Sequence, residues 1–411
     1  MIDQMEYTVT LDKLVYGGEA MGRLPDGRAI FVPFALPGEK VRTRLVVDKK
    51  GFARGELLEI LEPSSLRIDP CCKHFSICDG CHYQHLSYTE QLKEKEEILR
   101  DQLVRLGGLE NPPIEPIIAS PIEWNYRNHV IFHQDPTGKF GYSSSTPKKI
   151  VPIEECFLPI NSLNEFWPSL EFEHLADLKS LKLRHGEDES LMIVMETRTD
   201  EAFELEVDFP IKIIQRGPES MQLMSDNYFQ EILIMEKAFR ISAGSFYRAN
   251  TAVNEKMIHY LVDELPLTQK TTLVDAYSGV GIFSNFIASK VGKLIGIESD
   301  SGAVSDFLVN LEEFENVEIY EDLVDNALPT LDFPIDILLV DPPKTGLGPN
   351  VLDAIVLKSP PILVYVSSDT ATFARDAKRL SRSGYQMKKI QPFDLLPQTY
   401  HIETVSIWEK E

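Results

Sequence analysis

From about residue 241 onward, short apolar runs alternate with segments of helical character. The runs at 335–340 and 362–366 are apolar almost throughout, which is typical of strands buried on both faces of a parallel sheet. Similar runs at 273–277 and 293–298 lie on either side of a predicted helix. Strands that alternate with helices along a chain form a parallel sheet covered by helices. The C-terminal part is therefore predicted to be a doubly wound, Rossmann-like α/β domain.

The N-terminal part follows a different pattern. Short runs of alternating apolar and polar residues are separated by Gly- and Pro-rich turns at 17–18, 25–27 and 37–38. Alternation of this kind predicts half-buried strands, and the turn residues mark their ends. Several short strands joined by tight turns predict a small β-barrel of the OB type over residues 1–66.

A helix is predicted at 87–106, where Ser87 and Glu90 form a capping box and leucines recur on one stripe. Residues 119–240 are rich in predicted strands. We therefore expect a β-rich central domain. Its segments are 67–86 and 119–240. The predicted helix is expected to pack with the C-terminal domain, which then comprises 87–118 and 241–411.

The charge of the chain limits its partners. The net charge is −23, which argues against an indiscriminate nucleic-acid binder. Residues 1–150 are close to neutral, so an RNA partner is expected on the barrel, where basic residues gather. These residues are Arg42, Arg44, Lys49, Lys50 and Arg54. A solvated strand face accounts for them equally well.

No apolar run approaches the roughly 20 residues of a membrane span. The first residues also lack the basic and apolar regions of a signal peptide. We therefore expect a cytoplasmic protein without membrane contact, and a monomer. In that compartment the five cysteines are not expected to form disulfides.

Three of the cysteines, Cys72, Cys78 and Cys81, have the spacing C-x5-C-x2-C, and Cys156 lies far downstream. Four thiolates can hold a zinc ion or an iron–sulfur cluster. The spacing alone leaves both open, together with unrelated buried thiols.

A second candidate site lies at the turn after the strand at 273–277. Gly279 and Gly281 would let the backbone approach a ligand closely, and Glu298 ends the next strand, where a carboxylate can bind ribose hydroxyls. A tight turn without a ligand explains the glycines equally well. Asp341 follows another strand of the same sheet, at the end where ligands bind.

Several segments of the N-terminal half resemble known motifs. Residues 31–39, FVPFALPGE, resemble the "FVPGALPGE" signature of TRAM domains, which are RNA-binding barrels appended to RNA-modifying enzymes. Residues 72–85 are similar to "CPHFGxCGGCxxQH" and residues 151–156 to "VPIxxC". Both belong to the RNA uracil-5 methyltransferases.

The C-terminal half resembles the same family. Residues 275–283 are similar to "DLYCGVGTFS", residues 245–250 to "SFFQVN" and residues 341–344 to "DPPR". Residues 396–405 are similar to "FPxTxHxExV", and residues 364–372 to the "YVSCNPAT" segment. The resemblance covers nearly the whole chain and implies a class I methyltransferase domain.

The resemblance implies two cofactors, S-adenosylmethionine and a 4Fe-4S cluster, and RNA, either rRNA or tRNA, as substrate. The positions matching the family's S-adenosylmethionine site are Asp275, Tyr277, Gly279, Gly281, Glu298, Arg248 and Asp341. The cluster ligands would be Cys72, Cys78, Cys81 and Cys156, with Cys71 as an alternative first ligand.

The resemblance also implies the reaction. Glu403 matches the general base that removes the C5 proton, and Asp341 matches the residue that contacts the target base. Ser368 stands where the family has its nucleophilic Cys. A serine hydroxyl is a far weaker nucleophile than a thiolate unless a base activates it. Asp369 is the nearest carboxylate in sequence that could do so.

Two further departures bear on function. Arg248 replaces a Gln that contacts the cofactor, and Asp369-Thr370 replaces Asn-Pro. Three hypotheses follow. The first is a divergent or impaired uracil-5 methyltransferase. The second is an inactive RNA-binding paralogue. The third is a methyltransferase for another atom, such as an exocyclic amine, because Asp-Pro-Pro is also used on amines.

Overall fold

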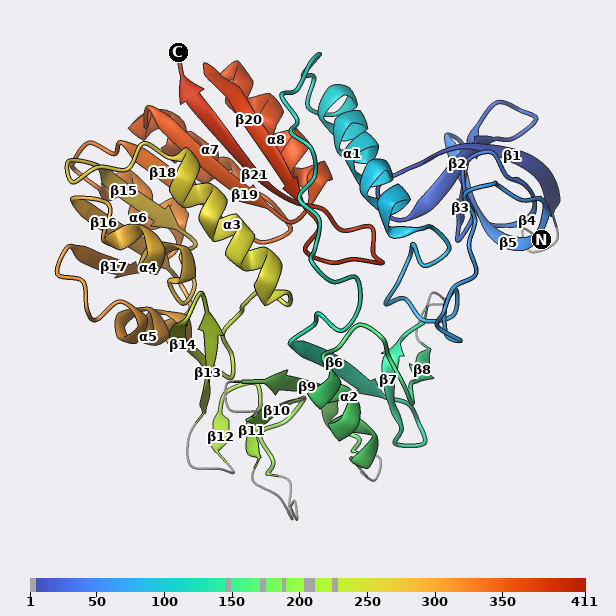
Figure 1. Ribbon diagram of the computed structural model, residues 1–411, viewed down its shortest axis with the longest axis horizontal. Coiled ribbons are helices and arrows are strands. Elements are labelled where there is room, and N and C mark those ends of the chain that lie inside the picture. Colours follow the sequence, from blue (N-terminus) through green and yellow to red (C-terminus); the bar gives the residue numbers. More distant parts are fainter. Residues whose placement is uncertain (1–4, 145–148, 171–174, 187–189, 203–210, 224–227) are drawn as a thin grey trace.

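A computed structural model describes residues 5–144, 149–170, 175–186, 190–202, 211–223 and 228–411. Three parts are evident in Figure 1: a barrel at the N-terminus, a central sheet, and a larger sheet covered by helices that ends at the C-terminus. In the described residues, no helix is long and apolar enough to cross a membrane.

The first part is a closed five-stranded barrel, as the sequence predicts. Its strands are β1 (Glu6–Leu14), β2 (Glu19–Arg23), β3 (Ala29–Pro33), β4 (Lys40–Asp48) and β5 (Phe52–Glu62), in the order β1-β2-β3-β5-β4. Alternate residues such as Leu11, Ile30 and Val41 point inward and are fully buried. Closure leaves the barrel with no free edge between its first and last strands.

The central part is a seven-stranded sheet in the order β12-β11-β10-β9-β6-β7-β8. Its strands are β6 (His129–Gln134), β7 (Phe140–Ser143), β8 (Ile150–Pro152), β9 (Leu178–His185), β10 (Leu191–Thr197), β11 (Lys212–Arg216) and β12 (Met221–Leu223). One face packs against α2 (Asn161–Phe166) and the 3₁₀ helix η1 (Trp167–Ser169). A separate hairpin, β13 (Phe229–Ile234) and β14 (Lys237–Ser242), leads to the third part.

The third part is a seven-stranded sheet in the order β17-β16-β15-β18-β19-β21-β20. Its strands are β15 (Thr272–Ala276), β16 (Lys293–Glu298), β17 (Val317–Glu321), β18 (Ile337–Val340), β19 (Ile362–Ser367), β20 (Tyr385–Phe393) and β21 (Glu403–Lys410). The first five are parallel, and β21 pairs antiparallel to β19 and β20. The strand order reverses between β15 and β18, which is the point where such sheets bind ligands.

Helices cover both faces of this sheet. One face packs against α3 (Thr251–Glu264), α4 (Ile282–Ala288) and α5 (Ser301–Asn310). The other packs against α6 (Val324–Thr330), α7 (Pro349–Lys358) and α8 (Thr370–Arg382). The α/β prediction is confirmed, because the runs at 335–340 and 362–366 contain the buried central strands β18 and β19.

Helix α1 (Tyr88–Arg105) joins the barrel to the third part. Ser87 caps it by accepting a hydrogen bond from the Glu90 backbone N–H at 3.4 Å. The helix packs alongside α8, as Figure 1 shows, and Asp101 accepts a bond from the barrel residue Lys13 at 2.6 Å. It therefore fixes the barrel relative to the large sheet.

Candidate active site

The turn between β15 and α4 has the backbone of a ligand-binding loop. Tyr277, Gly279 and Gly281 all have positive φ, at 66°, 54° and 84°. A Cβ on Gly281 would lie 2.4 Å from Leu311 Cδ1, so only glycine fits there, whereas nothing lies within 4 Å of a Cβ on Gly279. The space beside Gly279 is therefore open to a ligand.

Two carboxylates border this loop. The Gly279 N–H donates to Glu298 Oε2 at 3.0 Å, and Oε1 accepts from the backbone N–H groups of Ser299 and Asp300. Asp275 is buried at the end of β15, and burial raises its pKa to about 7. Its Oδ2 accepts from the Ser284 hydroxyl at 2.6 Å, while Oδ1 has no partner among the described residues.

A buried ion cluster lies beside this loop. The Arg248 guanidinium donates to both Asp341 oxygens, at 2.8 and 3.0 Å, and to Glu403 Oε1 at 3.1 and 3.2 Å. It also lies over the Phe283 ring, 4.9 Å from the ring centre. Three predicted site residues that are far apart in sequence therefore meet. The cluster holds two carboxylates and one cation.

Burial raises the pKa of the Glu403 carboxyl, and Arg248 opposes that shift. The side chains of Arg248 and Glu403 are 9% and 7% exposed, whereas that of Asp341 is 22% exposed. A carboxylate with a raised pKa suits the acceptance of a proton. Arg248 also orients it, because the guanidinium donates to a fixed oxygen.

Ser368 follows β19 directly and is half-buried. Within the described part of the chain, no hydrogen bond of its hydroxyl is found. Both oxygens of Asp369 have other partners: Oδ1 caps α8 by accepting from Thr372, and Oδ2 accepts from the Tyr16 hydroxyl at 2.7 Å. Asp369 is thus a helix cap and a contact to the barrel.

Tyr16 belongs to a cluster of rings where three parts of the chain meet. It comes from the loop between β1 and β2, and its ring centre is 5.4 Å from that of Tyr400. The His82 ring, from the cysteine-rich segment, is 4.6 Å from Tyr400. Tyr400 lies three residues before Glu403 in sequence. The barrel and the cysteine segment therefore both pack against the loop that leads to the predicted base.

Helix α1 holds the same loop from the other side. Lys95 and Asp394 are completely buried, and Lys95 Nζ donates to Asp394 at 2.6 Å. Gln91 exchanges two hydrogen bonds with Gln398, at 2.9 and 3.0 Å. The sequence analysis missed these residues, although Gln91 and Lys95 precede Leu99 at four-residue intervals on one helix stripe. That spacing was the available signal.

The cysteines have a more limited outcome. Among the described residues, no three His, Cys, Asp or Glu side chains are arranged so that they could hold a metal ion. Burial, with smaller contributions from Cys156 and Cys72, raises the pKa of Cys78 to about 11. Burial raises the pKa of Cys81 as well, and Cys156 and Cys78 contribute to the shift. Cys71 is exposed, and partial burial followed by Cys72 raises its pKa. Cys78 and Cys156 each interact with other predicted ligands, but the described residues do not form a metal site.

The basic residues of the barrel are largely paired. Arg42 lies within ion-pair distance of Glu6 and Glu59, at 3.4 and 2.9 Å. Arg44 pairs with Glu6 and Glu56, and Arg54 pairs with Glu19 at 3.3 Å. Much of the positive charge expected to attract RNA to the barrel is therefore offset by neighbouring carboxylates.

Comparison with known proteins agrees with this arrangement. Residues 194–411 match the family described as tRNA (Uracil-5-)-methyltransferase, and residues 5–58 match the TRAM domain. An uncharacterized RNA methyltransferase of Thermosynechococcus vestitus is 32% identical, over 97% of this chain and 96% of the relative. The 23S rRNA (uracil(1939)-C(5))-methyltransferase RlmD of Vibrio campbellii is 29% identical, over 98% and 95%.

A solved structure shares the fold. The Pyrococcus abyssi tRNA (uracil-54, C5)-methyltransferase, in complex with S-adenosyl-L-homocysteine, aligns with a TM-score of 0.72 and 23% identity, over 98% of this chain and all of that one. The strand order and the Gly279–Glu298 turn define a class I methyltransferase fold. Because the methyltransferase family match covers more than half of the chain, the chain belongs to the RNA (uracil-5-)-methyltransferase family, and it carries a TRAM domain.

Proposed function

We propose that this protein binds S-adenosylmethionine and RNA in the manner of its family, and that its transfer of a methyl group to uracil C5 is impaired. The observation that carries the second half is Ser368. Its hydroxyl has no base within hydrogen-bond reach among the described residues, and Asp369 is occupied by Tyr16 and Thr372. Serine without a base adds poorly to C6 of a pyrimidine.

The residues present fit the cofactor. The open space beside Gly279 and the unpartnered Oδ1 of Asp275 support a ligand at this turn. Glu298 would hold the ribose hydroxyls, since it ends β16 at the ligand-binding edge of the sheet. Asp275, Tyr277, Gly281, Arg248 and Asp341 would line the rest. When bound, S-adenosylmethionine supplies an electrophilic methyl group.

The protein's own groups support the chemistry of the family at the substrate side. Glu403 would take the C5 proton, and its raised pKa suits that role. Asp341 would contact the uracil edge. The amine hypothesis has less support, because Arg248 donates to both Asp341 oxygens and so occupies part of the acceptor capacity that an amino group would need. What this site lacks is an activated nucleophile.

A 4Fe-4S cluster held by Cys72, Cys78, Cys81 and Cys156 is the second part of the proposal. The donor set suits a cluster, since four thiolates from two segments lie near one another. The Gly80 N–H lies 3.3 Å from Cys78 Sγ, as in sites where backbone N–H groups bond to the sulfurs. Protein purified without oxygen should contain iron and acid-labile sulfide. Stoichiometric zinc in such protein would contradict the cluster.

Isothermal titration with S-adenosylmethionine tests the cofactor site. The wild-type protein should bind, and Glu298→Gln should weaken binding by about 10- to 100-fold, because a hydrogen bond to a charged group contributes about 1.5–3 kcal/mol. Glu321→Gln is the matched control, since Glu321 is exposed at the end of the next strand, β17. Absence of binding to the wild-type protein would contradict the proposal.

A further inference from the structure

The two faces of the central sheet differ in character. One face is the apolar core against α2, with residues such as Leu181, Leu183 and Ile193. The other carries the alternate residues of the same strands. In the strand register, Lys182 of β9 lies opposite Ile131 of β6 and Val194 of β10. We call this second face the basic face.

The basic face concentrates positive charge in an acidic protein. Its cations come from β9 and β11, and among the described strand residues it holds one carboxylate, Glu196, which lies beside Arg216 in the register. The cations are Lys182, Arg184, Lys212 and Arg216. An excess of cations on one face of a chain with a net charge of −23 marks a surface suited to an anionic partner.

Two of the four cations are already used inside the protein. Arg184 is fully buried and donates to the Ser242 carbonyl at 2.7 Å and to the Ser245 carbonyl. Lys212 Nζ donates to the Phe229 carbonyl at 2.8 Å. These two cations hold the chain around the β13–β14 hairpin against the sheet. They are not available to a partner.

The other two cations donate to no backbone carbonyl among the described residues. Lys182 is half-buried and has no hydrogen bond or ion pair among the described residues. The Arg216 side chain is 43% exposed, and its nearest carboxylate, Glu196, is at 3.5 Å. Burial, followed by Arg184 and Arg216, lowers the pKa of Lys182 to about 7, and Glu196 opposes this shift. A phosphate bound beside Lys182 would favour the charged form of its amine.

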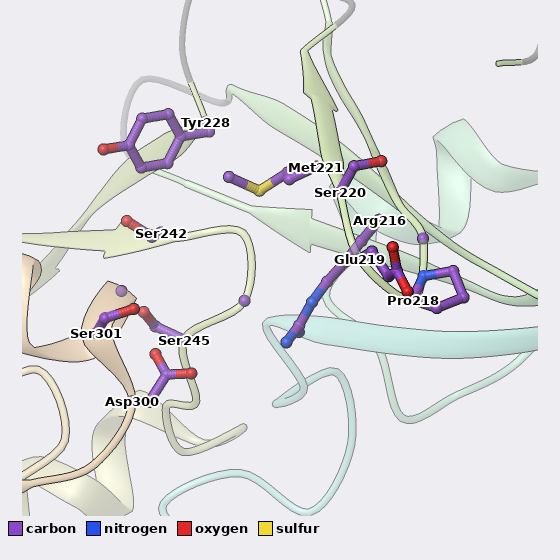
Figure 2. A pocket seen from close by; sticks show the side chains of 13 residues that line it. Arg216, Pro218, Glu219, Ser220, Met221, Tyr228, Ser242, Ser245, Asp300 and Ser301 are labelled. Atoms are coloured by element: carbon purple, nitrogen blue, oxygen red, sulfur yellow. The ribbon is translucent and has the colours of Figure 1, made fainter. Parts of the chain in front are cut away.

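The basic face adjoins the loop that carries Arg248. The Asn128 amide, at the start of the sheet, donates to the Arg248 carbonyl at 3.0 Å. Arg216 also lines a pocket of about 290 Å³ between the β11–β12 turn and the start of α5. Figure 2 shows its side chain reaching from the sheet towards Ser245 and Asp300. Asp300 is two residues beyond Glu298, so this pocket lies next to the predicted cofactor edge.

We propose that Lys182 and Arg216 bind the phosphodiester backbone of the substrate RNA and lead the strand across the central sheet towards Arg248, Asp341 and Glu403. This inference rests on the proposed function and adds the surface that the substrate crosses. An amine without an ion pair, a half-exposed guanidinium that holds one carboxylate, and exposed Ile131 suit a single strand, which offers phosphates and apolar base faces together. The barrel cations Arg42 and Arg44, which each contact two carboxylates, are expected to contribute little.

The test measures fluorescence anisotropy of a labelled oligouridylate about 20 nucleotides long, over a series of salt concentrations. Lys182→Met and Arg216→Met each remove a cation and keep an apolar stem. At about pH 6, where Lys182 is charged, each should weaken binding about fivefold near 0.1 M salt and lower the slope of log K against log salt by about 0.7. Arg42→Met, which removes the same charge from the barrel, is the matched control and should change binding less than twofold.

Two results would overturn the inference. One is an unchanged slope in both variants. The other is a wild-type protein that does not bind the oligouridylate at the lowest salt. Titration of the same samples with S-adenosylmethionine separates the inference from the proposed function, because the variants should keep wild-type cofactor affinity. Normal cofactor binding with unchanged RNA slopes would refute the basic face alone.

Discussion

Arg248 pairs with two carboxylates in a buried site, and its removal gives a quantitative prediction. Arg248→Met leaves Glu403 and Asp341 close together with side-chain exposures of 7% and 22%. Breaking a buried ion pair by removing one partner costs about 3–5 kcal/mol. Because Asp341 retains some contact with water, we expect Arg248→Met to lower the free energy of unfolding by about 3 kcal/mol near neutral pH.

The cost should depend on pH. Without Arg248, the pKa of Glu403 in the folded state rises further above its unfolded value, because the group that opposed the effect of burial is gone. A group with a raised folded pKa contributes stability that is present below the unfolded pKa and is lost as pH rises through the folded pKa. The free energy of unfolding of the variant should therefore fall, relative to wild type, between about pH 5 and about pH 8.

Urea denaturation followed by circular dichroism at these two pH values measures the difference. Arg240→Met is the matched control. Arg240 pairs with Asp306 at 2.9 Å, but Asp306 also accepts three hydrogen bonds from Ser242 and Ser245, so this carboxylate keeps polar partners when the cation is removed. An equal loss of stability at both pH values in Arg248→Met would refute the reasoning.

Three further predictions concern single side chains. Lys95→Met should lower the free energy of unfolding by about 3–5 kcal/mol, because it leaves the buried Asp394 carboxylate unpaired. Adding Asp394→Leu should restore much of this loss, and chemical denaturation of both variants measures it. Because burial raises the pKa of Asp275 to about 7, this group should lower the wild-type free energy of unfolding by about 1.4 kcal/mol per pH unit between about pH 4 and pH 7. Asp275→Asn should remove this fall, and a variant whose stability falls as steeply would contradict the prediction. Phe246→Ala should weaken RNA binding by about 1–3 kcal/mol without changing cofactor affinity, because Phe246 is 73% exposed beside Arg248 and can stack on a base; equal RNA affinity in anisotropy would contradict it.

The fold could be predicted because its signals are local. Apolar runs mark β18 and β19 as buried strands, and alternation with turns marks the barrel. The turn at Gly279 and Gly281 could be located for the same reason, since a strand, two glycines and a helix follow one another directly. These patterns depend on neighbours in the sequence and need no knowledge of the packed structure.

The long-range contacts within the site could not be predicted in the same way. Arg248 was expected only as a cofactor contact, whereas the structure also places it between Asp341 and Glu403, 93 and 155 residues away in sequence. Asp369 is adjacent to Ser368 in sequence, yet its oxygens bond to Thr372 and to Tyr16 of the barrel. Contacts of this range depend on how separate parts of the chain pack, which composition and periodicity do not record.

The measurement that tests the central claim most directly is covalent capture of RNA containing 5-fluorouridine. When a nucleophile adds to C6 of this base and a methyl group is transferred to C5, the covalent adduct persists, because C5 carries no proton that a base could remove. Wild-type protein mixed with S-adenosylmethionine and this RNA should give no slower-migrating band on a denaturing gel. Ser368→Cys supplies the missing thiol as a comparison. A robust band with wild-type protein, absent in Ser368→Ala, would show that the serine is activated and would contradict the account.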